Sequence, residues 1–179
     1  MHIGHPGNID IKYTITRRRS TTEILEGIGD DAPERAFFED DADFKSSFPD
    51  GHFNCWGIPQ RARPAFDKTR SGDLVLFVPA IGVHGGIHHI GIVRAKCRMT
   101  AHRASRVLWP DTPHDRVYPW LFFFDTENGY LEWFEFLQEL GYNHDWNPNG
   151  WYREPKAERF GNFGGAAGYL QHLRNLGFG

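Results

Sequence analysis

The sequence has little sulfur and no long apolar run. Its 179 residues include two methionines and two cysteines, Cys55 and Cys97, with no CxxC spacing. Two such thiols exclude a disulfide framework and fit burial in a reducing compartment, so a cytoplasmic location is expected. No stretch approaches eighteen consecutive apolar residues, which excludes a membrane span. The start, MHIGHPGNID, lacks the basic-then-apolar order of a secretory signal.

The whole chain also has no large excess of charge of either sign, because its net charge is −3. The distribution is uneven, because residues 52–108 hold nine Lys/Arg against two acids and the remainder carries a net −10. A basic centre between acidic ends is typical of surfaces that bind polyanions, although a solvated basic face without a partner gives the same pattern. The candidate phosphate contacts are Arg61, Arg63, Arg70, Arg94, Lys96, Arg98, Arg103 and Arg106.

Hydrophobic and aromatic residues are plentiful, at 40% and 15%, and indicate a globular chain. Residues 74–78, LVLFV, form an apolar run of buried-strand length after a tight turn. Further strands are expected at 9–16, 53–58, 84–97, 105–111 and 118–127. Short helices are expected after Ser20 or Thr21, which can cap the first of them, and within 60–70.

Short strands with turn signals, and few helices before the end, predict an α+β fold built on a small closed or nearly closed β-barrel with peripheral helices. One domain, residues 1–179, is expected. It would comprise a barrel core at about 50–127, an acidic surface excursion at about 30–51 and C-terminal helices at about 130–178.

Two tryptophans stand at the ends of strand-like runs, Trp56 in FNCWG and Trp109 in VLWPD. Either both are core residues of the barrel, or they face each other across a pocket and hold a flat ligand. A base stacked between indoles gains on the order of 1–3 kcal/mol per face. Trp120 alternates with Phe122 and Phe124, and core packing is its expected role.

The order FNCWGIP, AFDKTR, SGDLVLFV, GGIHHIGIVRAKC, VLWPD and YPWLFFFDTE, within about residues 50–127, resembles the YTH and EVE domains of the PUA-like superfamily. The resemblance implies a PUA-like barrel that binds nucleic acid carrying a modified base. YTH domains hold methylated adenine of RNA in an aromatic cage. EVE-like relatives recognise modified cytosine or adenine in DNA and are often fused to nucleases. The chain lacks a clear SxN run before its tryptophan, which favours DNA.

The resemblance also implies roles for single residues. Trp56 and Trp109 would be the walls of the cage, and Asn54 and Cys55 would contact the edge of the base. A duplex target would have to be flipped out of the stack. Independently, Asp125 ends a strand and can accept from an exocyclic amine or start a turn.

The histidines of HGGIHH suggest a rival class, a metal-dependent hydrolase or nuclease. The glycines make a helix improbable there, and no HExxH or CxxC supports the metal site, so His88 or His89 is expected in the base pocket or on phosphate. No metal, cofactor or catalytic residue is assigned. The histidines concerned are His84, His88 and His89.

The expected function is recognition of a methylated cytosine or adenine in DNA by base flipping. The chain would be the sensor of a modification-dependent restriction system, with the nuclease fused or on a partner. An RNA reader is the alternative within the same family. A protein-interaction module that docks through the acidic arm is the alternative outside it.

Overall fold

The computed structural model describes residues 2–4, 8–78, 85–99, 101–111, 117–146 and 156–179. The chain divides into two compact units, each assembled from separate segments. Unit 1 comprises residues 1–7, 72–92 and 126–179, and unit 2 comprises residues 8–71 and 93–125. The expectation of a single domain stays a prediction.

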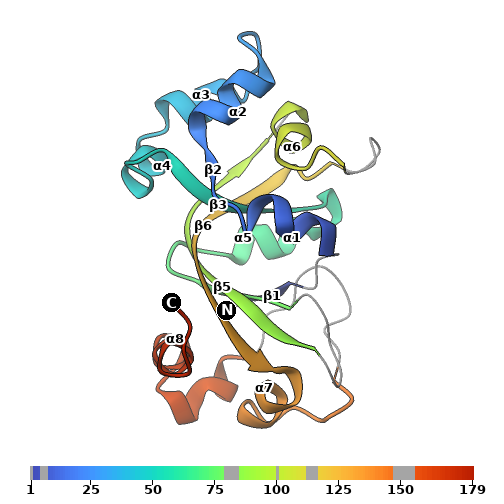
Figure 1. Ribbon diagram of the computed structural model, residues 1–179, viewed down its shortest axis with the longest axis vertical. Helices are drawn as coiled ribbons and strands as arrows, with labels where there is room; N and C mark the ends of the chain where they lie inside the picture. The colour runs from blue at the N-terminus through green and yellow to red at the C-terminus, as the bar shows by residue number, and fades with distance from the viewer. Residues whose placement is uncertain (1, 5–7, 79–84, 100, 112–116, 147–155) are drawn as a thin grey trace. The chain divides into compact units, whose positions relative to one another are not determined.

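The described strands pair in the linear order β1-β4-β5-β6-β3-β2 (Figure 1). Two long strands, β5 and β6, have 13 residues each and contribute one half to each unit. The bounds are β1 His2–Gly4, β2 Arg19–Ser20, β3 His52–Ile58, β4 Leu74–Phe77, β5 Gly86–Arg98 and β6 Trp120–Glu132. The α+β class is thus confirmed. The expected barrel closure is not formed by the described residues, because the strands at the two ends of the order do not pair with each other.

In unit 1, β4 pairs antiparallel with β5 and parallel with β1. Its core gathers apolar residues of β4, β5 and the end of β6 with three helical segments, and Trp133, Phe136 and Leu173 are among its buried members. The helical segments are α7 Trp133–Glu139, the 3-10 helix η2 Ala157–Phe163 and α8 Ala166–Asn175.

In unit 2, β3 pairs antiparallel with β6 from Asn54 opposite Phe124 to Ile58 opposite Trp120. All β3 residues after His52 are buried, as expected of a strand covered on both faces. The helices of this unit are α1 Asn8–Thr14, α2 Thr21–Ile28, α3 Arg35–Asp40, α4 Ala42–Ser47, η1 Gln60–Ala62, α5 Arg63–Lys68 and α6 Arg103–Leu108.

Two expected strands are helices. Residues 9–14 lie in α1, where Ile11 and Thr14 are buried at helical spacing, and the buried Ile15 follows directly, so the apparent alternation was misleading. Residues 105–111 overlap α6, in which Ala104 and Leu108, four apart, are buried. The expected strands at 53–58 and 74–78 and the helix capped by Ser20, whose side chain accepts from the Glu23 N–H, are confirmed.

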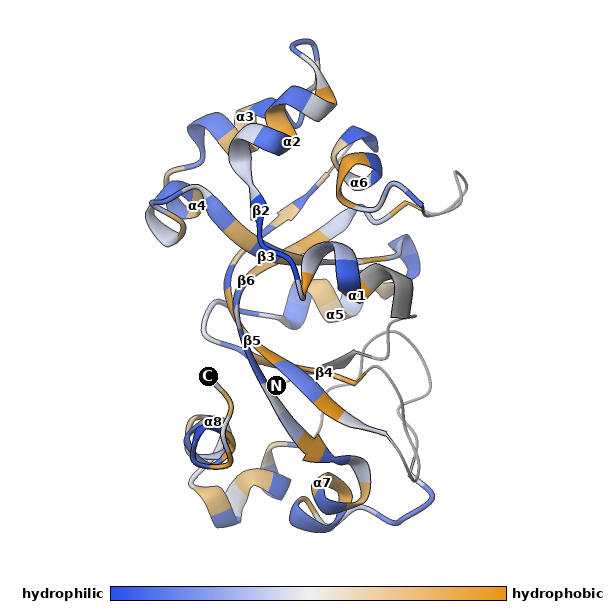
Figure 2. Cartoon of the chain, in the orientation of Figure 1, coloured by the Kyte–Doolittle hydropathy of each residue, from blue (hydrophilic) through white to orange (hydrophobic). Residues whose placement is uncertain are grey.

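The acidic segment 30–51 is not a surface excursion, because it forms α3 and α4 and contributes to the core of unit 2. Phe38, Phe44 and Phe48 of this segment are buried. The rings of Phe38 and Phe44 pack against Phe53 of β3 and Phe123 of β6. Figure 2 shows hydrophobic residues interspersed with hydrophilic ones in α2 and α3. Burial of the phenylalanines, about 1.5–3 kcal/mol each, outweighs the acidic composition.

None of the helices in the described ranges has the length and apolar character that crossing a membrane requires.

Candidate nucleic-acid interface

Trp56 and Trp109 are in contact, but they do not form parallel walls. Their ring centroids are 6.5 Å apart at an interplanar angle of 84°, and the residues are 2% and 1% exposed. Gly57 lets this cluster close, because a Cβ there would lie 2.8 Å from the Trp109 ring and 2.4 Å from Cβ of Tyr118. A base stacked between the indoles would need the rings to turn and separate. The cage stays a prediction that this arrangement does not support.

The residues expected at the base edge are also buried in unit 2. Asn54 donates both amide hydrogens to backbone carbonyls, those of Thr14 at 3.1 Å and Ile15 at 2.8 Å. Cys55 is fully buried, and this burial raises the pKa of its thiol well above the ordinary value. As placed, Asn54 ties β3 to the end of α1, and Cys55 is a core thiol, so neither side chain is offered to a base.

Asp125 lies on the surface of unit 2 in an ion pair. Its Oδ2 accepts from Nε of Arg94 at 3.0 Å, and both side chains are 49% exposed. An exocyclic amine or a phosphate would have to compete with this pair. Exposed pairs contribute little, typically below about 1 kcal/mol, so the competition is not costly.

Unit 2 brings several predicted phosphate contacts together around two aromatic rings. The ring centroids of Phe66 in α5 and Trp120 in β6 lie 4.9 Å apart. The guanidinium groups of Arg63 and Arg98 lie over the Trp120 ring, 5.9 and 5.2 Å from its centroid. The Lys96 ammonium lies 4.6 Å from the centroid of Phe66. We call Arg63, Phe66, Lys96, Arg98 and Trp120 the basic-aromatic cluster.

Within this cluster, Lys96 has a structural task. Its ammonium donates to the carbonyls of Phe66 at 2.8 Å and Thr69 at 2.6 Å, at the C-terminal end of α5. A cation at a helix C-terminus satisfies carbonyls that lack partners within the helix. Arg63 and Arg98 are exposed, and among the described residues the one ion pair of Arg63 is with the exposed Asp67, so these two guanidinium groups are the better candidates for phosphate.

The remaining predicted contacts are divided. Arg61 in η1 and Arg70 after α5 are exposed and close in sequence to the basic-aromatic cluster. Arg103 instead binds Asp31, with N–O distances of 2.5 and 3.0 Å, and the carbonyl of Ile28. Its hydrogen bond and charge hold the pKa of Asp31 below the ordinary value. Arg106 is exposed on α6.

The two described histidines of the HGGIHH motif, His88 and His89, belong to unit 1. Nδ1 of His89 lies 2.8 Å from Oδ1 of Asn128, and the His88 ring packs edge-on against Tyr130. His84 lies outside the described residues. Within the part of the chain that the structure describes, no group of three His, Cys, Asp or Glu residues is arranged to hold a metal ion.

His89 predicts a pH dependence. Burial lowers its pKa below the ordinary 6.5, against the opposing effect of the Asn128 hydrogen bond, so protonation is disfavoured in the folded state. The unfolded chain therefore takes up this proton first, and stability falls as the pH drops below about 6.5. His89→Gln, which retains a donor toward Asn128, should flatten this fall between about pH 7 and pH 5 in urea unfolding.

His102→Gln is the matched control, because it removes an exposed imidazole of unit 2. If both variants lose stability with acid as steeply as the wild type does, the burial of His89 is not the cause.

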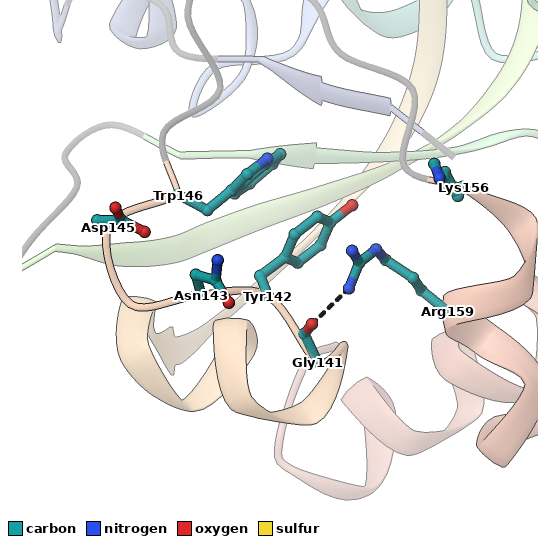
Figure 3. A pocket seen from close by; sticks show the side chains of 7 residues that line it. All are labelled: Gly141, Tyr142, Asn143, Asp145, Trp146, Lys156 and Arg159. Atoms are coloured by element: carbon teal, nitrogen blue, oxygen red, sulfur yellow. Dashed lines mark hydrogen bonds between the residues drawn. The ribbon is translucent and has the colours of Figure 1, made fainter.

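A pocket in unit 1 was not anticipated from the sequence (Figure 3). It has a volume of about 350 Å³ and lies beyond the end of α7, at the start of η2. Tyr142 and Trp146 stack at 4.0 Å, and Arg159 places its guanidinium 3.9 Å from the Tyr142 centroid. The sequence signal for this site is the polar and aromatic segment YNHDW, which follows a helix.

Comparison of the chain with protein-family models, curated proteins and solved structures finds no match. The likeness to EVE and YTH domains therefore rests on the sequence motifs alone.

Proposed function

We propose that this chain is a nucleic-acid-binding domain of the EVE/YTH-like, PUA-like kind that recognises a modified base. The favoured target is methylated cytosine or adenine in DNA, taken out of the stack by base flipping. The setting would be the sensor of a modification-dependent restriction system, with cleavage by a fused or partner nuclease. The observation that carries the proposal is the basic-aromatic cluster of unit 2.

The cluster supplies the phosphate contacts of a nucleic-acid surface, together with an aromatic support for the arginines that would make them. Exposed guanidinium groups neutralise phosphates and release counterions, which supplies affinity that depends on salt. Arginine is well suited to this task because its planar fork can bind a phosphate through two hydrogen bonds. Trp120, 3% exposed, lies beneath Arg63 and Arg98, so its contribution is to position the guanidinium groups.

Selectivity for a modified base must come from a separate pocket. Burying the added methyl group contributes about 0.8 kcal/mol to binding. This difference can distinguish a modified base from an unmodified one, but it is too small to supply the affinity of the complex. Flipping a base from a duplex costs a few kcal/mol, and the phosphate contacts and the pocket must offset this together.

The double variant Arg63→Gln, Arg98→Gln should bind oligonucleotides more weakly and with a smaller salt dependence. Each lost phosphate contact lowers the slope of log K against log salt by about 0.9 on duplex DNA, so we expect a decrease of about 1.8. Binding would be measured by fluorescence anisotropy over a salt series. The panel comprises DNA and RNA oligonucleotides, single- and double-stranded, unmodified or carrying methylcytosine or methyladenine.

Arg103→Gln is the matched control, because it removes the same charge from a guanidinium already committed to Asp31. An equal loss of slope in the control would show a diffuse effect of net charge instead of a defined surface. Failure of the wild type to bind any oligonucleotide would refute the proposed function, and a preference for methylated RNA would redirect it to the RNA-reading relatives.

A further inference from the structure

The pocket of unit 1 is built around a stack of aromatic rings that ends in a cation. The Trp146 ring is nearly parallel to the Trp133 ring, with centroids 5.9 Å apart and an interplanar angle of 17°. It is also nearly parallel to the Tyr142 ring, with centroids 4.0 Å apart and an angle of 22°. Figure 3 shows Tyr142 between Trp146 and Arg159. Trp133 is buried in the core of unit 1, so the stack extends from the core into the pocket.

The backbone holds this stack in place. After α7, Gly141 adopts a φ of +63°, which glycine tolerates, and the Tyr142 N–H donates to the Leu137 carbonyl at 2.8 Å. Arg159 donates from Nη1 to the carbonyls of Leu140 and Gly141 at 2.8 and 2.5 Å. The guanidinium is therefore oriented before any ligand binds, which reduces the entropy lost on binding.

The pocket also presents polar groups with unused bonding capacity. Within the described residues, no hydrogen-bond partner contacts the Tyr142 hydroxyl, the Asn143 amide, the Asp145 carboxylate, the indole N–H of Trp146, or Nε and Nη2 of Arg159. Lys156 lies at the same pocket, and in the part of the chain that the structure describes its one ion pair is with Glu158, 3.6 Å away, where both side chains are about three-quarters exposed. This set includes donors, acceptors and two cations beside the aromatic rings of Tyr142 and Trp146.

We propose that this pocket binds a nucleotide, a planar base with an attached phosphate. Arg159 and Lys156 would pair with the phosphate, Tyr142 and Trp146 would contact the base, and Asn143 and Asp145 would face its polar edge. The volume of about 350 Å³ is within the range of small-ligand sites.

The residue types restrict the ligand further. Two cations against one carboxylate disfavour a metal ion and favour an anion. A carboxylate accepts from an exocyclic amine, as acids do with the N4 amine of cytosine, so Asp145 favours an amine-bearing base over thymine. The nucleotide can be free or part of a strand, and only the second source rests on the proposed function. In that case the pocket would receive the flipped base, in place of the Trp56–Trp109 pair.

Isothermal titration calorimetry with dCMP, dAMP, dTMP, deoxycytidine and inorganic phosphate tests the inference. We expect dCMP and dAMP to bind more tightly than dTMP, and the nucleoside and phosphate alone to bind more weakly than dCMP. Trp146→Ala should weaken binding of dCMP about fivefold, because Trp146 lines the pocket and its ring holds Tyr142 in place. Asp145→Asn should remove the preference for dCMP over dTMP.

The controls separate binding from folding. Tyr130→Ala removes a tyrosine of the same unit that is 53% exposed and does not line the pocket, and it should bind dCMP as the wild type does. Asp145 and Lys156 are exposed, so Asp145→Asn and Lys156→Gln test the site even if Trp146→Ala fails to fold. Lys156→Gln should weaken dCMP binding and leave deoxycytidine binding unchanged.

The two proposals fail separately. If the folded wild type gives no heat with any nucleotide, the pocket inference is wrong even where oligonucleotides still bind. It is also wrong if Asp145→Asn and Lys156→Gln bind dCMP as tightly as the wild type does. If nucleotides bind but oligonucleotides do not, the pocket stands and the proposed function falls. Equal affinity for a glutamate peptide would also overturn the inference, because a non-planar anion would then be using the cations alone.

Discussion

Replacing Arg19 by methionine is expected to lower the free energy of unfolding by about 2–5 kcal/mol, because two backbone carbonyls lose their donors. The Arg19 side chain is 5% exposed, and its guanidinium donates to the carbonyls of Val107 and Leu108 at 3.1 Å each. It also forms two hydrogen bonds to Glu23, at 3.0 and 2.9 Å. Methionine preserves much of the side-chain stem but leaves the two carbonyls at the end of α6 without donors.

Arg17→Met is a close control for this change, because Arg17 pairs with the same carboxylate of Glu23 at 3.1 Å but is 61% exposed. An exposed pair contributes about 0.2–1 kcal/mol, so Arg17→Met should have a small effect. Urea unfolding, followed by far-UV circular dichroism, gives both values. Equal losses in the two variants would mean that the shared ion pair matters and the buried carbonyls do not.

Several elements could be predicted because their signals are local. The apolar run at 74–78 and the hydrophobic FNCWGI are strands, and Ser20 caps α2 through its own side chain. Such elements depend on neighbouring residues only, namely a turn before a strand or a hydroxyl three residues before an N–H.

The two strands that proved to be helices show the limit of periodicity in short segments. In residues 9–16, alternation and helical spacing differ at one or two positions, and packing of α1 against β3 decides between them. The acidic segment at 30–51 was judged by its charge, but its phenylalanines bury against Phe53 and Phe123, which are distant in sequence. Long-range packing of this kind has no signal within the segment itself.

The candidate sites divide in the same way. The sequence located the basic residues of the centre, and the structure groups Arg63, Lys96 and Arg98 around Phe66 and Trp120. The sequence could not show that the Lys96 ammonium donates hydrogen bonds to carbonyls at the end of α5, because this depends on how α5 packs beside β5. The pocket around Tyr142 and Arg159 joins two segments across residues 147–155, and only the folded chain brings them together.

Trp109→Ala distinguishes a core tryptophan from a cage wall. Trp109 is buried and packs edge-on against Trp56 and Tyr118, so truncation should leave a cavity and cost about 3–5 kcal/mol of unfolding free energy. A tryptophan that lined an open cage would be partly solvated, and its truncation would affect stability much less. Urea unfolding of the variant measures this difference directly.

Trp146→Ala supplies the comparison, because Trp146 is only partly buried and lines the pocket of unit 1. We expect the opposite pattern for the two tryptophans, with Trp109→Ala losing more stability and Trp146→Ala losing more nucleotide affinity. Trp109→Phe, which refills part of the cavity, should recover part of the stability. A stable Trp109→Ala protein that no longer distinguishes methylated from unmodified DNA would instead mean that the indoles separate in solution and form the cage implied by the family resemblance.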